Sequence, residues 1–228
     1  MGTVPTGDNY APGVAAEATS AAADDERAWL LRAVLVLIDP RPVFAALRDD
    51  TEPATAARQE AVLALVILAG IASVLWTPVA GRLLDEPRID GLLVAVWAFI
   101  GGSIYGLIAY FALGAVLYGG LRGAGSLGSF RRARHLLAFA AAPLALSLVL
   151  WPLRLAAFGG DLFRAGGSDK GTANDLFVAA EFGFAAWSLA LLAVGVRTVH
   201  GWTWLRALGG LSLAAAIAAL VVAGVRLL

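Results

Sequence analysis

The chain has 228 residues, of which 60% are hydrophobic and 15% are charged, and its mean hydropathy is +0.78. An ordinary soluble domain is about 45–50% apolar and about 25% charged, so this composition excludes that class and indicates an integral membrane protein. The formal net charge of zero argues against nucleic acid as a partner, and the absence of cysteine excludes disulfides and cysteine-bound metals. Of the 17 basic residues only Lys170 is a lysine, which suggests an arginine-rich bacterial genome.

The charged residues divide the chain into parts. Residues 1–60 hold 5 Lys or Arg and 10 Asp or Glu, whereas residues 61–228 hold 12 and 7. Residues 1–24 are mostly small, polar or acidic, so we expect them to be disordered. No basic residue precedes Arg27, so a cleaved secretory signal is not expected. We therefore predict cytoplasmic interfacial helices at 25–60 and a transmembrane domain at 61–228.

The apolar run at residues 28–38 is too short to cross a bilayer, which takes about 20 residues. Asp39-Pro40 ends it, and we predict a helix that lies in the membrane interface with Trp29 at headgroup level. Pro42 suits the first turn of a second short helix over residues 43–47. These two helices either pad the bundle or recognise a partner.

Five longer apolar runs follow, and each has about the 20 residues needed to cross the hydrocarbon. The first helix is expected to begin early, with Thr51 or Glu52 as its cap and Pro53 in its first turn. Pro143 and Pro152 are expected to break the third. The sequence thus predicts an all-α polytopic membrane helix bundle with five transmembrane helices. The runs lie at about residues 61–80, 91–118, 135–158, 176–196 and 203–228.

Basic residues favour one side of the predicted membrane. The N-terminal segment and the two loops on its side contain 11 Lys or Arg, and the opposite side contains 6. The positive-inside rule then places the N-terminus in the cytoplasm and the C-terminus outside, as five spans require. Trp76 and Trp151 fall near the outer interface, and Trp202 and Trp204 near the inner one, as in an aromatic belt. The predicted location is the cell (inner) membrane.

Residues 123–128 fit the dinucleotide pattern G-x-G-x-x-G, but an apolar span precedes them where that motif needs a strand. We interpret them as a flexible cytoplasmic loop, with Ser129 capping the third helix. Three arginines follow in the first turn, where they oppose the helix dipole. Basic residues in that position suggest contact with anionic lipid headgroups or with an acidic partner. The predicted cytoplasmic contact loop consists of Arg122, Phe130, Arg131, Arg132 and Arg134.

Small residues in two spans predict close helix packing. Gly102 and Gly106 form a G-x-x-x-G motif in the second span, and Gly210 with Ala214 is a weaker version in the fifth. Packing within the bundle is the simpler interpretation, and homodimerisation is the alternative. Pro143 is assigned to helix packing as well, as a static kink.

Two ionisable residues lie inside apolar runs, Arg154 in the third span and Glu181 in the fourth. The spans are consecutive, so the two residues can form a structural ion pair, or Arg154 can snorkel outward alone. Alternatively, Glu181 has a proton, ion or ligand role, because intramembrane charges are functional by default. His135 and His200 lack nearby carboxylates and make a poor metal site. We predict no catalytic residues, no metal and no cofactor, and hence no enzyme.

A set of short segments in a fixed order along the chain carries a resemblance to a known family. They are Ile38-Asp39-Pro40 with Phe44 and Leu47, residues 125–132, Ala140-Ala141-Ala142-Pro143, residues 195–202, and Arg206-Ala207. From about Val36 to Arg226 the chain resembles the bacterial branch of the Yip family, the Ypt-interacting membrane proteins. That family has a cytoplasmic N-terminal segment followed by five membrane spans. Its eukaryotic members are implied to bind small GTPases and each other in vesicle traffic, through an acidic motif of which only Asp39-Pro40 is present here.

The resemblance implies a non-enzymatic interaction protein, so the first hypothesis is a membrane adaptor or scaffold that acts through its cytoplasmic face. The second is a small transporter or ion-conducting protein that uses Glu181. Five spans do not divide into two equal repeats, which argues against the commonest transporter plan. The expected partners are the lipid bilayer and either a protein partner or a second copy of the chain.

Overall fold

The computed structural model describes residues 28–77, 91–163 and 171–226, and the regular secondary structure within them is entirely helical. The predicted all-α fold is therefore confirmed. The segment at 1–24, predicted to be disordered, lies outside the described residues. Helical residues 28–35 are followed by α2 (Pro40–Ala46), α3 (Glu52–Ala57), α4 (Gln59–Leu75), α6 (Gly91–Gly123), α7 (Phe130–Ala140), α8 (Ala142–Leu146), η1 (Ser147–Val149), α9 (Leu150–Phe158), η2 (Gly159–Phe163), α10 (Thr172–His200) and α11 (Trp204–Arg226).

Four helical stretches among the described residues are long and apolar enough to cross a membrane: α6, the continuous run Phe130–Leu162, α10 and α11. The chain is thus a multi-pass membrane protein, but the predicted count of five is one too high by this measure. The first predicted span corresponds to α4, whose 17 residues extend about 26 Å, less than the hydrocarbon thickness of about 30 Å. The sequence Thr77-Pro78 explains the early end, because a residue before proline disfavours helical geometry.

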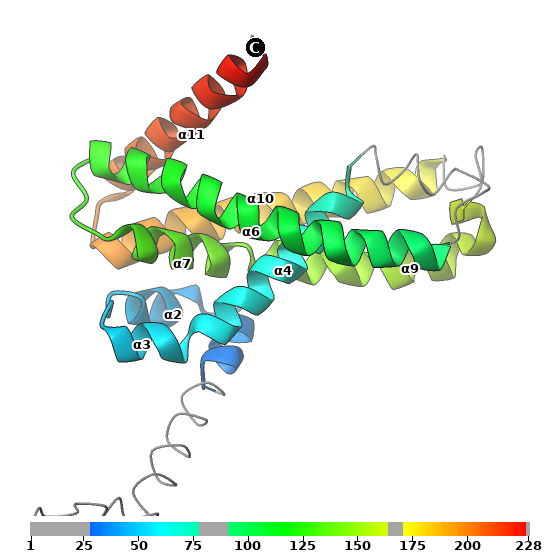
Figure 1. Ribbon diagram of the computed structural model, residues 1–228, viewed down its shortest axis with the longest axis horizontal. Helices are drawn as coiled ribbons and strands as arrows, with labels where there is room; N and C mark the ends of the chain where they lie inside the picture. The colour runs from blue at the N-terminus through cyan, green and yellow to red at the C-terminus, as the bar shows by residue number, and fades with distance from the viewer. Residues whose placement is uncertain (1–27, 78–90, 164–170, 227–228) are drawn as a thin grey trace, which may run out of the picture.

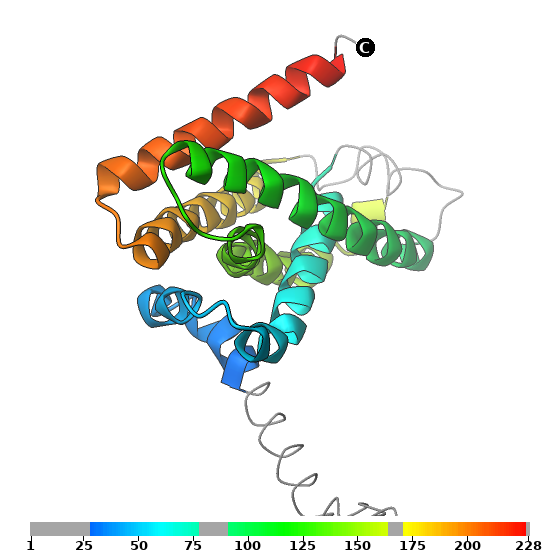
Figure 2. The ribbon, with the colours of Figure 1, turned by 60° about the vertical axis from the view of Figure 1, so that its left-hand side comes forward.

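Most of the long helices lie along the long axis of the molecule, and the N-terminal helices cover one end of them. In Figure 1, α6, α10 and the α7-to-α9 run extend along the long axis of the molecule. The helices α2 and α3 lie beneath α7 at one end, and α11 leaves that end at an angle to the others (Figures 1 and 2). The core beneath α2 includes Phe44, Leu47, Leu136 and Phe139, all 0% exposed. The N-terminal helices are therefore part of the folded core.

Trp29 illustrates how the first helical segment is held. Its ring is buried against Phe139 of α7, with the centroids 5.5 Å apart, and the guanidinium of Arg32 lies 4.5 Å over its outer face. The side chain therefore faces the protein rather than the lipid headgroups that the sequence suggested. The opposite face of this segment is apolar and exposed, and comprises Leu30, Leu31, Val34, Leu35 and Ile38.

The third predicted span is interrupted where proline requires it. Ser129 caps α7, as predicted, with its hydroxyl accepting a hydrogen bond from the Arg132 amide at 3.0 Å. Helix α7 ends at Ala140, and Pro143 occupies the first turn of α8, where its missing N–H costs no hydrogen bond. The side chain of Pro143 is fully buried, so the break at this point is packed into the bundle.

The two glycines predicted to permit close packing lie between α6 and α4. A Cβ on Gly102 would come within 2.5 Å of the Ile71 Cα, and one on Gly70 within 2.6 Å of the Gly106 Cα. The pairing of Gly102 with Ile71 and of Gly106 with Val66 makes α4 and α6 antiparallel. Contact between backbones without intervening side chains is the usual effect of small residues in membrane helices.

Candidate functional site

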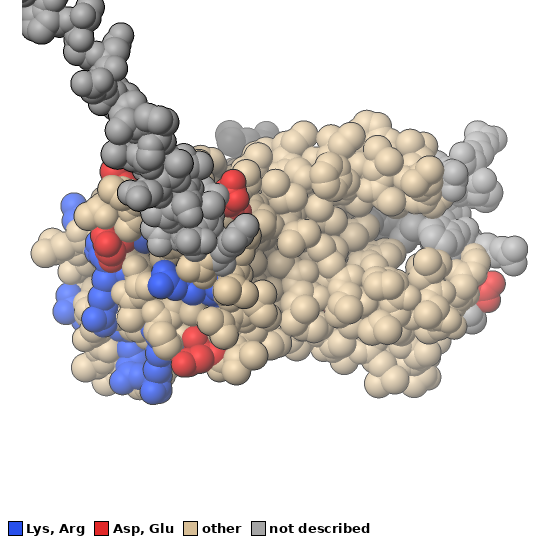
Figure 3. Space-filling model, turned by 90° about the horizontal axis from the view of Figure 1, so that it is seen from below, with Lys and Arg blue, Asp and Glu red and all other residues tan. Residues whose placement is uncertain are grey.

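Charged side chains gather at one end of the molecule, whereas its flank is almost entirely uncharged (Figure 3). This charged end is built by the turn between α2 and α3 with the start of α3, the residue between α3 and α4, the turn between α6 and α7, the first turns of α7 and the start of α11. We refer to these elements together as the charged end throughout. Its charged residues are Arg48, Asp49, Asp50, Glu52, Arg58, Arg122, Arg131, Arg132, Arg134 and Arg206.

Arg58 lies at the centre of the charged end and is 0% exposed. Its Nε donates to Nδ1 of His135 on α7 at 2.8 Å, and one terminal nitrogen donates to the backbone carbonyl of Asp49 at 2.7 Å. The other terminal nitrogen pairs with Oδ1 of Asp50 at 3.3 Å. Burial lowers the pKa of Arg58 from its usual value and Asp50 opposes the shift, so a buried charge is compensated here by fixed partners.

Asp50 is the anion that the first turns of α7 face. The Ser129 hydroxyl donates to its Oδ2, and the Arg131 Nε lies 3.4 Å from its Oδ1. Arg131 also donates to the Asp50 carbonyl at 3.0 Å, and a terminal nitrogen of Arg132 is 4.0 Å from Oδ2. Two of the three arginines that oppose the α7 dipole, Arg131 and Arg132, therefore find their counter-charge within the chain. We call Asp50, Arg58, Ser129, Arg131, Arg132 and His135 the Asp50 network.

Further contacts attach α2 to the end of α10. The Nε of Arg48 donates to the carbonyl of Thr198 at 3.1 Å, and Arg132 donates to the carbonyl of Arg48 at 2.8 Å. The ring of Phe44 lies against Gly195, where a Cβ would come within 2.9 Å of it. Three segments far apart in the sequence, around residues 44–50, 129–135 and 195–200, are thereby brought together.

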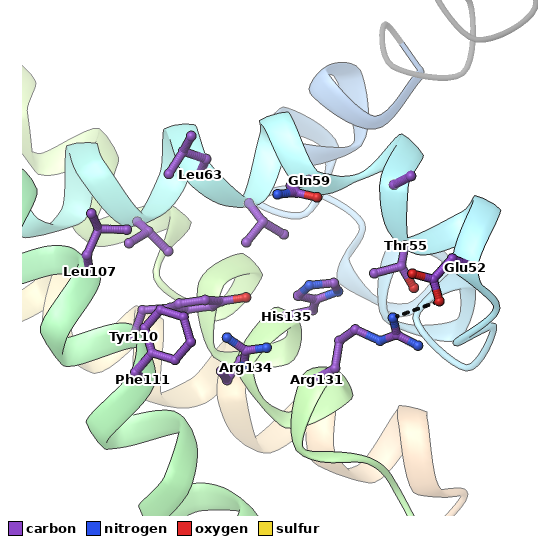
Figure 4. Close-up of a pocket in the computed structure, with 13 residues that line it drawn as sticks. Glu52, Thr55, Gln59, Leu63, Leu107, Tyr110, Phe111, Arg131, Arg134 and His135 are labelled. Atoms are coloured by element: carbon purple, nitrogen blue, oxygen red, sulfur yellow. Dashed lines mark ion pairs between the residues drawn. The ribbon is translucent and has the colours of Figure 1, made fainter.

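Arg134 differs from the other two arginines of α7. Its guanidinium stacks over the rings of Tyr110, Phe111 and Phe130, at 5.1, 4.5 and 4.7 Å from their centroids. No hydrogen bond or ion pair of this guanidinium is formed within residues 28–77, 91–163 and 171–226, and its Nε is buried without a partner. The side chain points into a cavity of about 330 Å³ between α3, α4, α6 and α7 (Figure 4).

The five residues of the predicted contact loop therefore do not form one surface. Arg131 and Arg132 are engaged by Asp50, and Arg134 faces the cavity. Arg122 is exposed in the last turn of α6 and donates to the carbonyl of Ser126 at 3.2 Å. The ring of Phe130 lies edge-on to Tyr118 at 5.8 Å.

The two intramembrane charges lie far from this site, toward the opposite end of the long axis, on α9 and the first half of α10 (Figure 1). A terminal nitrogen of Arg154 donates to Oε1 of Glu181 at 2.9 Å, and the other donates to Oδ1 of Asn174 at 2.8 Å. Both charged side chains are 12% exposed. The structure thus brings Arg154 and Glu181 into direct contact.

Sequence reasoning did not single out Arg58 and Asp50, which were counted only as charges, or Tyr110. The sequence did contain a signal for Arg58 and Asp50. The topology predicted from positive charge already placed the acidic pair Asp49-Asp50 on the same side as the basic turn of the third span. Complementary charges on one side of a membrane are candidates for pairing. Within the described residues, no three His, Asp or Glu side chains cluster as a metal site would require.

The comparisons with known proteins gave one result. A family model described as the Yip1 domain matches residues 34–225, which is most of the chain and includes every residue of the Asp50 network. Neither the curated proteins nor the solved structures gave a match.

Proposed function

The chain belongs to the Yip1 domain family, and on that premise we propose that it is a non-enzymatic membrane adaptor or scaffold that acts through its charged end. The observation that supports this most strongly is the Asp50 network. It fixes the N-terminal helices to α7 through a buried arginine that joins residues 77 positions apart. A surface held rigidly in this way loses little conformational entropy when a partner binds, which favours recognition.

The exposed part of the charged end offers a contact surface. Leu127, in the turn between α6 and α7, is 93% exposed, the largest value among the large apolar side chains described. Arg122 and Arg206 flank this turn, and Arg206 holds it by donating to the carbonyls of Ala124 and Gly125. An exposed leucine within a basic rim fits a partner with an apolar spot surrounded by acidic residues.

We further propose that the charged end faces the cytoplasm and the C-terminus lies outside a bacterial cell membrane. The excess of basic residues on the predicted inner side supports this orientation. It requires the chain to cross between Arg58 and Gly91, and the antiparallel packing of α4 on α6 supports such a crossing. The exposed apolar face of residues 30–38 would then rest in the inner interface.

Single cysteines test the orientation directly, because the chain has none of its own. Leu127→Cys and Val225→Cys are both exposed and are predicted to lie on opposite sides of the membrane. In intact cells, a membrane-impermeant maleimide should label Val225→Cys and spare Leu127→Cys, and in cells made permeable it should label both. Labelling of Leu127→Cys in intact cells would contradict the proposed orientation.

The adaptor role is tested by purifying the full chain from native membranes in a mild detergent and identifying the bound proteins by mass spectrometry. Removing residues 1–60 would be a poor test, because it deletes Arg58 and Phe44 from the core. Leu127→Glu and Arg122→Glu instead alter exposed positions of the proposed surface. The matched control is Thr172→Glu, an exposed position in the first turn of α10, where a negative charge suits the helix dipole.

We expect a reproducible partner that is lost with Leu127→Glu and Arg122→Glu and kept with Thr172→Glu. A partner that survives all three variants would show that the contact is made elsewhere on the molecule. The absence of any reproducible protein partner would contradict the adaptor role.

A further inference from the structure

The cavity in front of Arg134 has the features of a binding site that the adaptor role does not use. Its polar wall comes from α3, α4 and α7, with Thr55, Gln59, Arg131, Arg134 and His135. In Figure 4 the guanidinium of Arg134 and the hydroxyl of Tyr110 lie toward the middle of this space. A volume of about 330 Å³ falls within the range of pockets that bind small molecules.

Among the residues that the structure describes, the charges around the cavity leave one positive charge without an anion. Glu52 at the mouth pairs with Arg131 at 3.5 Å, and Arg131 also contacts Asp50. His135 accepts a hydrogen bond from Arg58 through Nδ1, which requires that nitrogen to carry no proton. Arg134 alone among these groups contacts only aromatic faces, so the cavity presents an uncompensated guanidinium.

The opposite wall of the cavity is apolar and continues along the bundle. Val62, Leu63, Leu107 and Phe111 line it. A second cavity of about 130 Å³ shares Val66 and Tyr110 with the first and lies between α4, α6, α7 and α8. Its other lining residues are mostly apolar, including Leu113, Leu137 and Leu144. The polar chamber thus adjoins a mostly apolar second cavity, which we call the groove.

The position in the fold indicates that this groove meets the bilayer. Ile108 and Phe111, beside the cavity on α6, are 62% and 50% exposed in a helix long enough to cross the membrane. Basic pockets between membrane helices at the headgroup level are typical sites for anionic lipids. A free phosphate or an acidic peptide would satisfy Arg134 but would leave the apolar groove unfilled.

We propose that this cavity binds one anionic phospholipid, with its phosphate on Arg134 and one acyl chain in the groove between α4, α6, α7 and α8. Arg134, fixed by three rings, would recognise the phosphate by charge-assisted hydrogen bonds. Tyr110 and Gln59 supply further hydrogen-bond donors. This proposal does not depend on the adaptor role.

The test uses the full chain in mild detergent and native mass spectrometry with added lipid. The probes are phosphatidylglycerol and phosphatidylcholine with the same acyl chains, and inorganic phosphate as a soluble competitor. We expect one phosphatidylglycerol to bind about tenfold or more tightly than phosphatidylcholine, because the zwitterionic headgroup offers the guanidinium a compensated charge. Inorganic phosphate in millimolar excess should not displace the lipid.

Four variants sharpen the outcome. Arg134→Gln should weaken phosphatidylglycerol about tenfold, and Arg134→Lys should recover part of the loss. The matched control Arg41→Gln removes an exposed arginine of α2 that does not line the cavity, and should change affinity by less than about twofold. Glu52→Gln should strengthen binding, because it removes the carboxylate at the mouth that partly neutralises Arg131.

If Arg134→Gln does not fold, Leu107→Trp serves the same purpose by filling the apolar wall while leaving every charge in place. It should abolish phosphatidylglycerol binding. Four results would each overturn the proposal: equal affinity for the two lipids, equal effects of Arg134→Gln and Arg41→Gln, displacement by inorganic phosphate, or unchanged binding to Leu107→Trp.

Discussion

Two arginines with little or no exposed surface, Arg58 at the charged end and Arg154 toward the other end, are stabilised in different ways. Both are held in an apolar protein where an unpaired charge would be costly. Arg58 is fully buried and donates to a histidine nitrogen, a backbone carbonyl and a carboxylate. Arg154 is slightly exposed and donates hydrogen bonds to two side chains, and its Nε is buried without a partner.

The difference lies in what each arginine connects. The partners of Arg58 lie in the turn before α3 and on α7, so it joins the N-terminal helices to the bundle. The partners of Arg154 both lie on α10, 20 and 27 residues away, so it links α9 to the helix that follows it. Arg58 should therefore contribute more to tertiary stability than Arg154. Its partners form a complete set on distant segments, whereas those of Arg154 form an incomplete set on a neighbouring helix.

The largest expected effect comes from Arg58→Met. This change leaves Nδ1 of His135 and the carbonyl of Asp49 without their donor and removes the buried cation paired with Asp50. Breaking a buried ion pair costs about 3–5 kcal/mol in the free energy of unfolding. Denaturant unfolding of the purified full chain in detergent would measure it. Arg58→Lys should recover less than half of the loss, because an ammonium cannot replace the planar fork.

The control for charge alone is Arg41→Gln, which removes an exposed arginine of α2 and should stay within about 0.5 kcal/mol of the native chain. A loss below about 1 kcal/mol for Arg58→Met would show that the Asp50 network does not hold the N-terminal helices, and the contrast with Arg154 would fail.

A smaller effect on stability is expected when Arg154 loses its anion, Glu181. Glu181→Gln keeps an oxygen that accepts from Arg154, and the contact with Asn174 remains. A double-mutant cycle with Arg154→Met should give a coupling of about 0.6–1.7 kcal/mol, the range found for polar pairs within membrane proteins. A coupling larger than the effect of Arg58→Met would reverse the comparison.

Much of this architecture could be predicted from the sequence, because hydropathy and helix-breaking residues act locally. The apolar runs predicted the long helices, Ser129 predicted the cap of α7, and Pro143 predicted the break before α8. The same reasoning overestimated the first span, since the apolar residues continue past Trp76 whereas Thr77-Pro78 disfavours further helix.

The partners of the charged residues could not be predicted in the same way. A count of basic residues treats Arg58, Arg131 and Arg134 alike, yet one is buried, one faces Asp50 and one faces the cavity. These differences depend on how α2 and α3 fold back under α7, a long-range contact that no local pattern encodes. The sequence therefore predicted a region of arginines, while their internal pairing and the cavity were found only in three dimensions.

A third prediction sharpens the comparison within the Asp50 network. The Ser129 hydroxyl both caps α7 and donates to Asp50, so Ser129→Ala should cost about 1 kcal/mol, as for other N-cap serines. Ser73→Ala is the matched control, because that hydroxyl donates only to the Ala69 carbonyl one turn earlier in α4. If Ser129→Ala and Ser73→Ala lower the free energy of unfolding equally, then neither the cap nor the contact of Ser129 with Asp50 contributes measurably to stability.

The smallest expected effect lies at the outer edge of the charged end, where Asp49 is exposed. The backbone N–H of Thr51 donates to its carboxylate at 3.0 Å, and this hydrogen bond lowers the pKa of Asp49 below its usual value of 3.8. Because the folded chain holds the proton less tightly than the unfolded chain, the stabilisation is fully present above that value. It is lost as the pH falls through the lowered pKa of the folded state.

Unfolding of the native chain and of Asp49→Asn should therefore be compared from neutral pH to about pH 2, across the titration of aspartate. The amide still accepts from Thr51 but does not titrate, so the variant should lose less stability than the native chain in the acidic part of this range. The difference should be far smaller than the effect of Arg58→Met, because water screens an exposed carboxylate and surrounds it in both states. A difference as large as that of Arg58→Met would mean that the edge of the charged end, rather than its buried arginine, holds the N-terminal helices in place.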